Sequence, residues 1–90
     1  MTAYEETCVE NAYQDGQIDA LCVYSDNDAT QLLNVPHADV YANVREALET
    51  GEADFYGPDH VPLSPGAKAL VACRWADGWL DQIRAMAAAR

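Results

Sequence analysis

Apolar positions recur at helical spacing along most of the chain, and four helices account for the pattern. The first apolar stripe has members four residues apart: Tyr4, Cys8 and Ala12. Ahead of it, Thr2 to Glu5 have the S/T-x-x-E form of a capping box, so a first helix is predicted from about residue 3 to Gln14. Gly16 either ends this helix or lies inside a longer one. Whether residues 17–24 are helix or strand stays open, because the apolar run Leu21–Tyr24 suits either.

Two further helices are predicted in the middle of the chain. Ser25–Asp28 is a turn and N-cap cluster, which places a short second helix over Ala29–Asn34, and Pro36 prevents its continuation. A third helix over Val40–Thr50 has a single apolar stripe, made of Val40, Tyr41, Val44, Ala47 and Leu48. Residues 52–63 form a loop that could hold a short extended piece at Phe55–Tyr56.

The last predicted helix is long and has a clear start. Ser64 is a good N-cap and Pro65 suits the first helical position, so the helix is expected over Ser64–Ala88. One stripe of apolar positions alternates four and three residues apart: Ala72, Ala76, Trp79, Ile83 and Met86. Trp79 is predicted to be core and Trp75 partly exposed or at a subunit contact. At roughly 38 Å the helix is longer than so small a core requires. Its end is therefore expected to fray or to pack on a partner, for which a second copy of the chain in a homodimer is one candidate.

The fold class expected from this pattern is mainly α. The chain reads as one acidic helical domain over residues 1–90, a bundle of about four helices with a long C-terminal helix. Its core is predicted to contain Val44, Leu48, Leu70, Trp79 and Ile83.

Charge is spread unevenly along these elements. The sequence has 15 Asp and Glu against five Lys and Arg, for a formal net charge of −10 at pH 7. Residues 1–44 hold eight of the acids and no Lys or Arg, whereas residues 60–90 carry a small positive excess. Arg74 and Arg84 are expected to pair with Asp77 and Asp81, three residues away. Packing of the basic segment on the acidic part would neutralise at most a few charges, and a large single-sign field remains.

This balance excludes several classes of function. Binding to nucleic-acid phosphates or to anionic lipids depends on Lys and Arg, which are scarce here.

The first residues lack the basic start and apolar run of a signal peptide, and apolar stretches such as Ala69–Cys73 are far too short to cross a membrane. Cys8, Cys22 and Cys73 form no C-x-x-C pair, which indicates reduced thiols and a cytoplasmic location.

No residue pattern for catalysis or ligand binding is complete. Asp26–Thr30 begins like a calcium loop, but the sixth and twelfth positions hold Gln31 and His37 where Gly and Glu are required. Neither His37 nor His60 has a zinc ligand three or four residues later, although a site assembled from distant Cys and His stays open. Cys73 lies in an apolar helix with no activator other than Arg74. We therefore expect no enzymatic activity, no cofactor and no metal.

One local motif has a family resemblance. Trp75-Ala-Asp-Gly78-Trp79 resembles the W-x-x-G-W signature in the C-terminal helix of ribosome modulation factor-like proteins, and Ala12–Gly16 resembles that family's early A-x-x-x-G stretch. The resemblance implies a related helical hairpin. It also implies an alternative function, a small regulatory or self-associating helical module without nucleic-acid mimicry.

A second resemblance is one of class. A small, acidic domain without a catalytic site is similar to phage-encoded inhibitors, anti-CRISPR proteins among them, and this resemblance implies occupation of a basic nucleic-acid-binding surface. A CRISPR effector holds nucleic acid in a positively charged channel. We therefore predict an inhibitor of a basic nucleic-acid-binding protein, with a solvated acidic face as the simpler interpretation. The residues expected to bind the partner are Glu6, Glu10, Asp15, Asp19, Asp26 and Asp28.

Overall fold

The structure is a computed structural model of the chain and describes residues 1–50 and 63–89. These residues form four helices: α1 (Ala3–Val23), α2 (Asp26–Leu32), α3 (His37–Thr50) and α4 (Pro65–Ala88). No strand occurs in the described ranges, so the mainly α class with a long C-terminal helix is confirmed. The extended piece expected at Phe55–Tyr56 and the second histidine, His60, lie outside the described residues.

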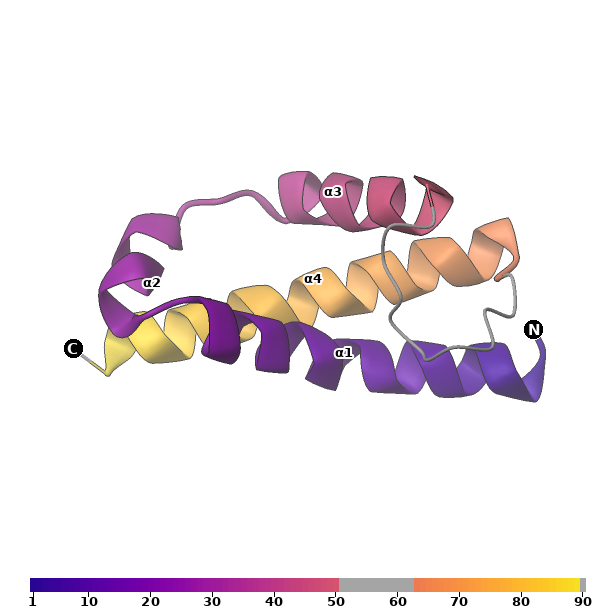
Figure 1. The fold of residues 1–90 in the computed structure, drawn as a ribbon, viewed down its shortest axis with the longest axis horizontal. Helices are drawn as coiled ribbons and strands as arrows, with labels where there is room; N and C mark the ends of the chain where they lie inside the picture. The colour runs from indigo at the N-terminus through magenta and orange to yellow at the C-terminus, as the bar shows by residue number, and fades with distance from the viewer. Residues whose placement is uncertain (51–62, 90) are drawn as a thin grey trace.

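Helix α4 is the central element of the fold. It runs along the long axis of a molecule that measures 41 × 20 × 19 Å, and α1, α2 and α3 each pack against it (Figure 1). Its predicted apolar stripe is entirely buried, from Ala72 to Met86. The end of α4 is covered by the chain itself, because α2 packs near it and Met86 is only 6% exposed.

Two predictions about the core were wrong. Trp75 is only 8% exposed, since it lines hollows against both α1 and α3, which flank α4. Leu70 is 44% exposed, because it lies two residues, or about 200° of helix rotation, from the buried stripe at Ala72. Trp79, Val44 and Ile83 are buried as predicted, and Leu48 packs partly buried against the core.

The middle helices start earlier than predicted. Ser25 is the N-cap of α2 and forms a capping box with Asp28, so the helix begins at Asp26 and has ended by Leu32. The predicted range Ala29–Asn34 was therefore displaced toward the C-terminus. Helix α3 begins at His37, directly after Pro36, and not at Val40.

Helices α1 and α4 run in the same direction and touch through their backbones (Figure 1). A Cβ atom added at Gly16 would collide with the carbonyl oxygen of Trp75 and lie 2.9 Å from the amide nitrogen of Trp79. One added at Gly78 would collide with the carbonyl oxygen of Tyr13. The other buried apolar positions of α1 are also small: Cys8, Ala12 and Ala20. Gly16 lies in this contact, and α1 continues past Gly16 to Val23. The predicted end of the first helix at Gln14 was therefore wrong, and residues 21–24 form no strand.

One carboxylate joins the starts of the two parallel helices. Glu5 accepts the Thr2 N–H at 2.9 Å, in the predicted capping box, and the Ser64 N–H at 2.8 Å. The positive dipole ends of α1 and α4 lie together here, and a negative charge stabilises both. The hydrogen bonds from the Thr2 and Ser64 backbones lower the pKa of Glu5 from 4.5 to about 2.

Replacing either contact glycine is expected to destabilise the protein. Gly16→Ala and Gly78→Ala should each lower the free energy of unfolding by roughly 3 kcal/mol, the upper end for overpacking, because the new methyl group meets backbone atoms. Gly66→Ala is the matched control, since a Cβ there meets nothing within 4 Å, and it should stabilise by up to about 1 kcal/mol. Urea denaturation measures all three. Equal stabilities for Gly16→Ala and Gly66→Ala would contradict the backbone contact.

The Glu5 bridge predicts an acid-dependent stability difference. Because the pKa of Glu5 is about 2 in the folded chain and near 4.5 without its partners, its contribution is present above pH 4.5 and disappears as the pH falls toward 2. The difference in free energy of unfolding between wild type and Glu5→Gln should therefore shrink between pH 4.5 and 2. Glu6→Gln, at the exposed neighbouring position, is the control and should differ little from wild type. A Glu5→Gln difference that is constant across this range would argue against the bridge.

Candidate functional site

Three hollows share lining residues and are together called the acidic groove; its described carboxylates are Asp15, Asp19 and Asp28. The largest, of about 470 Å³, lies between α1, α3 and α4. The second, of about 320 Å³, shares Asp19 and Trp75 with the first. The third, of about 310 Å³, reaches α2 and shares Val23 with the second and Tyr24 with the first.

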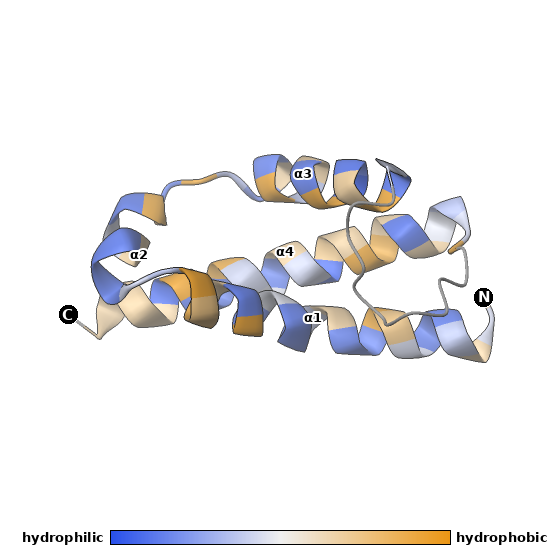
Figure 2. Cartoon of the chain, viewed as in Figure 1, coloured by the Kyte–Doolittle hydropathy of each residue, from blue (hydrophilic) through white to orange (hydrophobic). Residues whose placement is uncertain are grey.

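The walls of the acidic groove are largely apolar and aromatic. Trp75 and Trp79 of α4 line its largest part, and the Tyr24 ring packs edge-on against the Trp79 ring with centroids 5.7 Å apart. Ile18 and Val23, which line the second hollow, remain 49% and 61% exposed. Figure 2 shows strongly hydrophobic positions, in orange, on the last turns of α1. The groove therefore offers both apolar contact area and negative charge.

Two groove carboxylates are partly withdrawn from water. Burial raises the pKa of the Asp15 carboxyl above its usual range. Burial also raises the pKa of Asp19, and a hydrogen bond from Trp79 acts in the opposite direction. Neither carboxylate forms an ion pair with a cation in the described part of the chain. A half-buried charge of this kind costs stability in the free protein and is typical of binding sites.

The six acids predicted to bind a partner do not share one surface. Glu6 and Asp15 are nine residues apart on α1, as are Glu10 and Asp19, and nine residues make about two and a half turns. Glu6 and Glu10 therefore project from the side of α1 opposite the groove. Of the other two residues, Asp28 lines the groove and also caps α2, whereas Asp26 is exposed in the first turn of α2.

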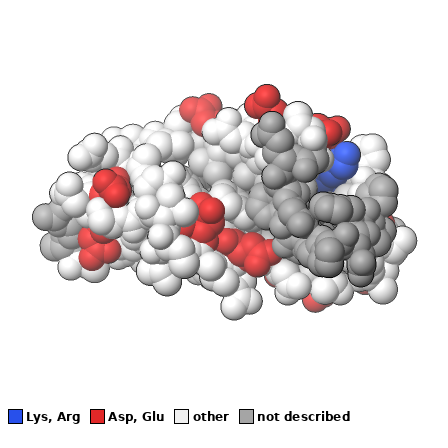
Figure 3. All heavy atoms as spheres, in the orientation of Figure 1, with Lys and Arg blue, Asp and Glu red and all other residues white. Residues whose placement is uncertain are grey.

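The basic residues lie in α3 and α4 and pair with acids there. Glu49 binds both Arg45, at 3.2 Å, and Lys68, at 3.5 Å. The predicted pairs of Arg74 with Asp77 and Arg84 with Asp81 are present, at 2.9 Å and 3.4 Å. Every cation in residues 1–50 and 63–89 thus has a carboxylate partner outside α1 and α2. On the face drawn in Figure 3, acidic atoms are spread along the molecule and basic atoms are confined to one place.

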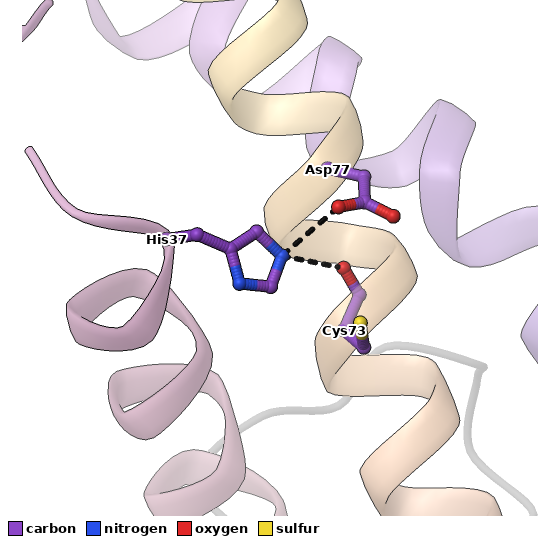
Figure 4. A group of neighbouring side chains, drawn as sticks. All are labelled: His37, Cys73 and Asp77. Carbon is purple, nitrogen blue, oxygen red and sulfur yellow. Dashed lines mark hydrogen bonds and ion pairs between the residues drawn. The ribbon is translucent and has the colours of Figure 1, made fainter.

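A second cluster of polar side chains lies where α3 begins. The structure brings together His37, at the start of α3, and two residues one turn apart on α4, Cys73 and Asp77 (Figure 4). The imidazole Nε2 lies 2.9 Å from an Asp77 carboxylate oxygen and 3.3 Å from the Cys73 backbone carbonyl oxygen. Sequence reasoning missed this cluster because it looked for ligands near each histidine. The four-residue spacing of Cys73 and Asp77 was the available signal.

No helix in the described ranges combines the length and the apolar character that crossing a membrane requires. Comparisons of the chain with protein-family models, curated proteins and solved structures gave no match. The two resemblances noted in the sequence therefore stay predictions, and functional inference depends on the geometry of the chain itself.

Proposed function

We propose that the protein is a non-enzymatic inhibitor that binds a basic nucleic-acid-binding protein, such as a CRISPR effector complex, and blocks its nucleic-acid site. The observation that carries this proposal is the separation of charge. The described cations are paired within α3 and α4, and none of them pairs with an acid of α1 or α2. A basic surface would supply what these carboxylates lack.

The acidic groove is the part of the surface best suited to such a partner. Asp15 and Asp19 lose hydration in the free protein without gaining a cation. An Arg or Lys side chain of the partner would compensate both carboxylates, and such complementary charges speed association and select the partner. The exposed side chains of Ile18 and Val23 beside them favour a protein surface, which offers apolar contacts as well as positive charge.

Charge density alone is too low for the protein to replace a nucleic acid. Asp15 and Asp19 lie about 6 Å apart along the axis of α1, whereas one strand of duplex DNA carries a phosphate every 3.4 Å or so. Binding through the groove would therefore combine electrostatic attraction with apolar burial. The proposed inhibition is steric and electrostatic, without turnover.

The alternative function, a self-associating helical module, has less support. Its predicted interface was the C-terminal helix with Trp75 at a subunit contact, and Trp75 is buried within the chain. In the described part of α4, Leu70 is the only large apolar residue that is exposed. A regulatory helical module that binds through another face is the competing class of function.

Two matched variants test the groove. Asp15→Asn/Asp19→Asn and Glu6→Gln/Glu10→Gln each remove two charges, one turn apart, from opposite sides of α1. We expect the groove pair to weaken inhibition about tenfold or more, equivalent to roughly 1.4 kcal/mol, and the opposite pair to change it by less than about threefold. The assay measures displacement of labelled DNA from purified basic DNA-binding proteins, CRISPR effectors among them, at several salt concentrations.

Inhibition should weaken as salt rises, because screening reduces attraction between exposed charges. Circular dichroism confirms that both variants remain folded. Equal losses for the two pairs would mean that net charge alone acts and would contradict a groove-specific interface. Full inhibition by Asp15→Asn/Asp19→Asn would overturn the assignment, and absence of binding to every basic protein tested would favour the helical module.

A further inference from the structure

His37, Cys73 and Asp77 bring three different kinds of metal-binding atom close together. Their imidazole nitrogen, thiol sulfur and carboxylate oxygen all lie within 4.8 Å of one another. Figure 4 shows the imidazole of His37 reaching across from α3 to the two α4 residues. The side chains of His37 and Asp77 are 40% and 35% exposed, so an ion from solvent can reach the cluster.

The spacing of these atoms is close to that of a tetrahedral zinc site. Zinc binds nitrogen and oxygen at about 2.0–2.1 Å and sulfur at about 2.3 Å, which places the ligand atoms of one ion roughly 3.3–3.6 Å apart. The ligand atoms of the cluster lie within 4.8 Å of one another, so no pair has to approach by more than about 1.5 Å to reach these separations. We propose that His37, Cys73 and Asp77 bind a single zinc ion, with water in the fourth position.

Neighbouring groups support coordination by Asp77. The Arg74 guanidinium binds the Oδ2 atom of Asp77 at 2.9 Å, which leaves Oδ1 directed toward His37. A hydrogen bond to the second oxygen of a ligating carboxylate orients it and is a usual feature of metal sites. In the present arrangement Oδ1 bonds the imidazole Nε2, and zinc would take the place between them.

The charges of the site also suit a divalent cation. Coordination requires the Cys73 thiol to lose its proton to solvent and the imidazole to bind through an unprotonated nitrogen. The thiolate and the Asp77 carboxylate then supply two negative charges beside zinc, and the Arg74 guanidinium on Oδ2 of Asp77 adds one positive charge to the site. The net charge of −10 on the whole protein favours the approach of a cation.

Bound zinc would fix α3 against α4. His37 lies between Val35 and Val40, and both of these valines line the largest hollow of the acidic groove. The ion would therefore hold one wall of that hollow in place. The metal site itself does not depend on the proposed function, because its ligands are separate from the groove carboxylates.

Cobalt(II) is a direct probe of this site. Titration of the reduced full-length protein with Co²⁺ should produce one tetrahedral site per chain, with a thiolate-to-cobalt charge-transfer band that Zn²⁺ abolishes by displacement. Cys73→Ser should lose the band and bind Zn²⁺ at least about 100-fold more weakly, and Asp77→Asn should also weaken binding. Cys22→Ser removes an exposed thiol elsewhere and should retain the band, which makes it the matched control.

Thermal melting supplies a second readout. Zn²⁺ should raise the melting temperature of wild type and Cys22→Ser and leave that of Cys73→Ser unchanged, because an ion that binds only the folded state stabilises it. Circular dichroism without metal confirms the fold of each variant. The proposal is overturned if wild type binds neither ion at micromolar concentration, if Cys73→Ser retains the band, or if Cys22→Ser loses it. Should Cys73→Ser not fold, retention of wild-type affinity by Asp77→Asn overturns it.

Discussion

The backbone contact between α1 and α4 at Gly16 and Gly78 is the constraint on which the rest of the structure depends. Two parallel helices cannot be joined by a short turn, so the chain must return along the molecule between them, and α2 and α3 make that return. Both then pack on α4, which leaves the space between α1 and α3 as the largest hollow of the groove. Glu5 offsets the cost of placing two positive helix ends together.

The same arrangement separates the two kinds of charge. Cations in α3 and α4 lie within reach of acids on those helices and pair with them. Helices α1 and α2 contain no Lys or Arg, and the groove places Asp15 and Asp19 beside aromatic and aliphatic side chains. Trp75 lines the groove, while Cys73 and Asp77, each two residues or about 200° of helix rotation from Trp75, meet His37. Helix α4 thus connects the proposed partner-binding and metal-binding surfaces.

Much of the fold could be predicted from local signals. The capping box at Thr2, the Ser64-Pro65 start and the spacing of the α4 apolar stripe each act within one helix, and each prediction is confirmed. The burial of Trp75 was missed because it depends on two other helices. The start of α2 was missed although Ser25 and Asp28 have capping-box spacing.

The sites were harder to predict because they depend on which helices meet. The opposite placement of Glu6 and Asp15 follows from their spacing only when α1 is known to continue through Gly16. His37 and Cys73 are 36 residues apart, and no local pattern places His37, at the start of α3, beside Cys73 on α4. The two glycines were visible in the A-x-x-x-G and W-x-x-G-W stretches. The contact of each glycine with the other helix could not be predicted, because spacing within one helix does not show which helix packs against it or in which direction that helix runs.

Nuclear Overhauser effects in the folded protein test the parallel α1–α4 contact most directly. The account predicts cross-peaks between the Hα protons of Gly16 and the amide proton of Trp79, and between those of Gly78 and the Hα proton of Tyr13, since a Cβ at either glycine would meet these backbones. It also predicts contacts between Glu5 and Ser64 at the shared start of the helices. Absence of the glycine cross-peaks, together with contacts from the start of α1 to the end of α4, would show an antiparallel pair and contradict the account.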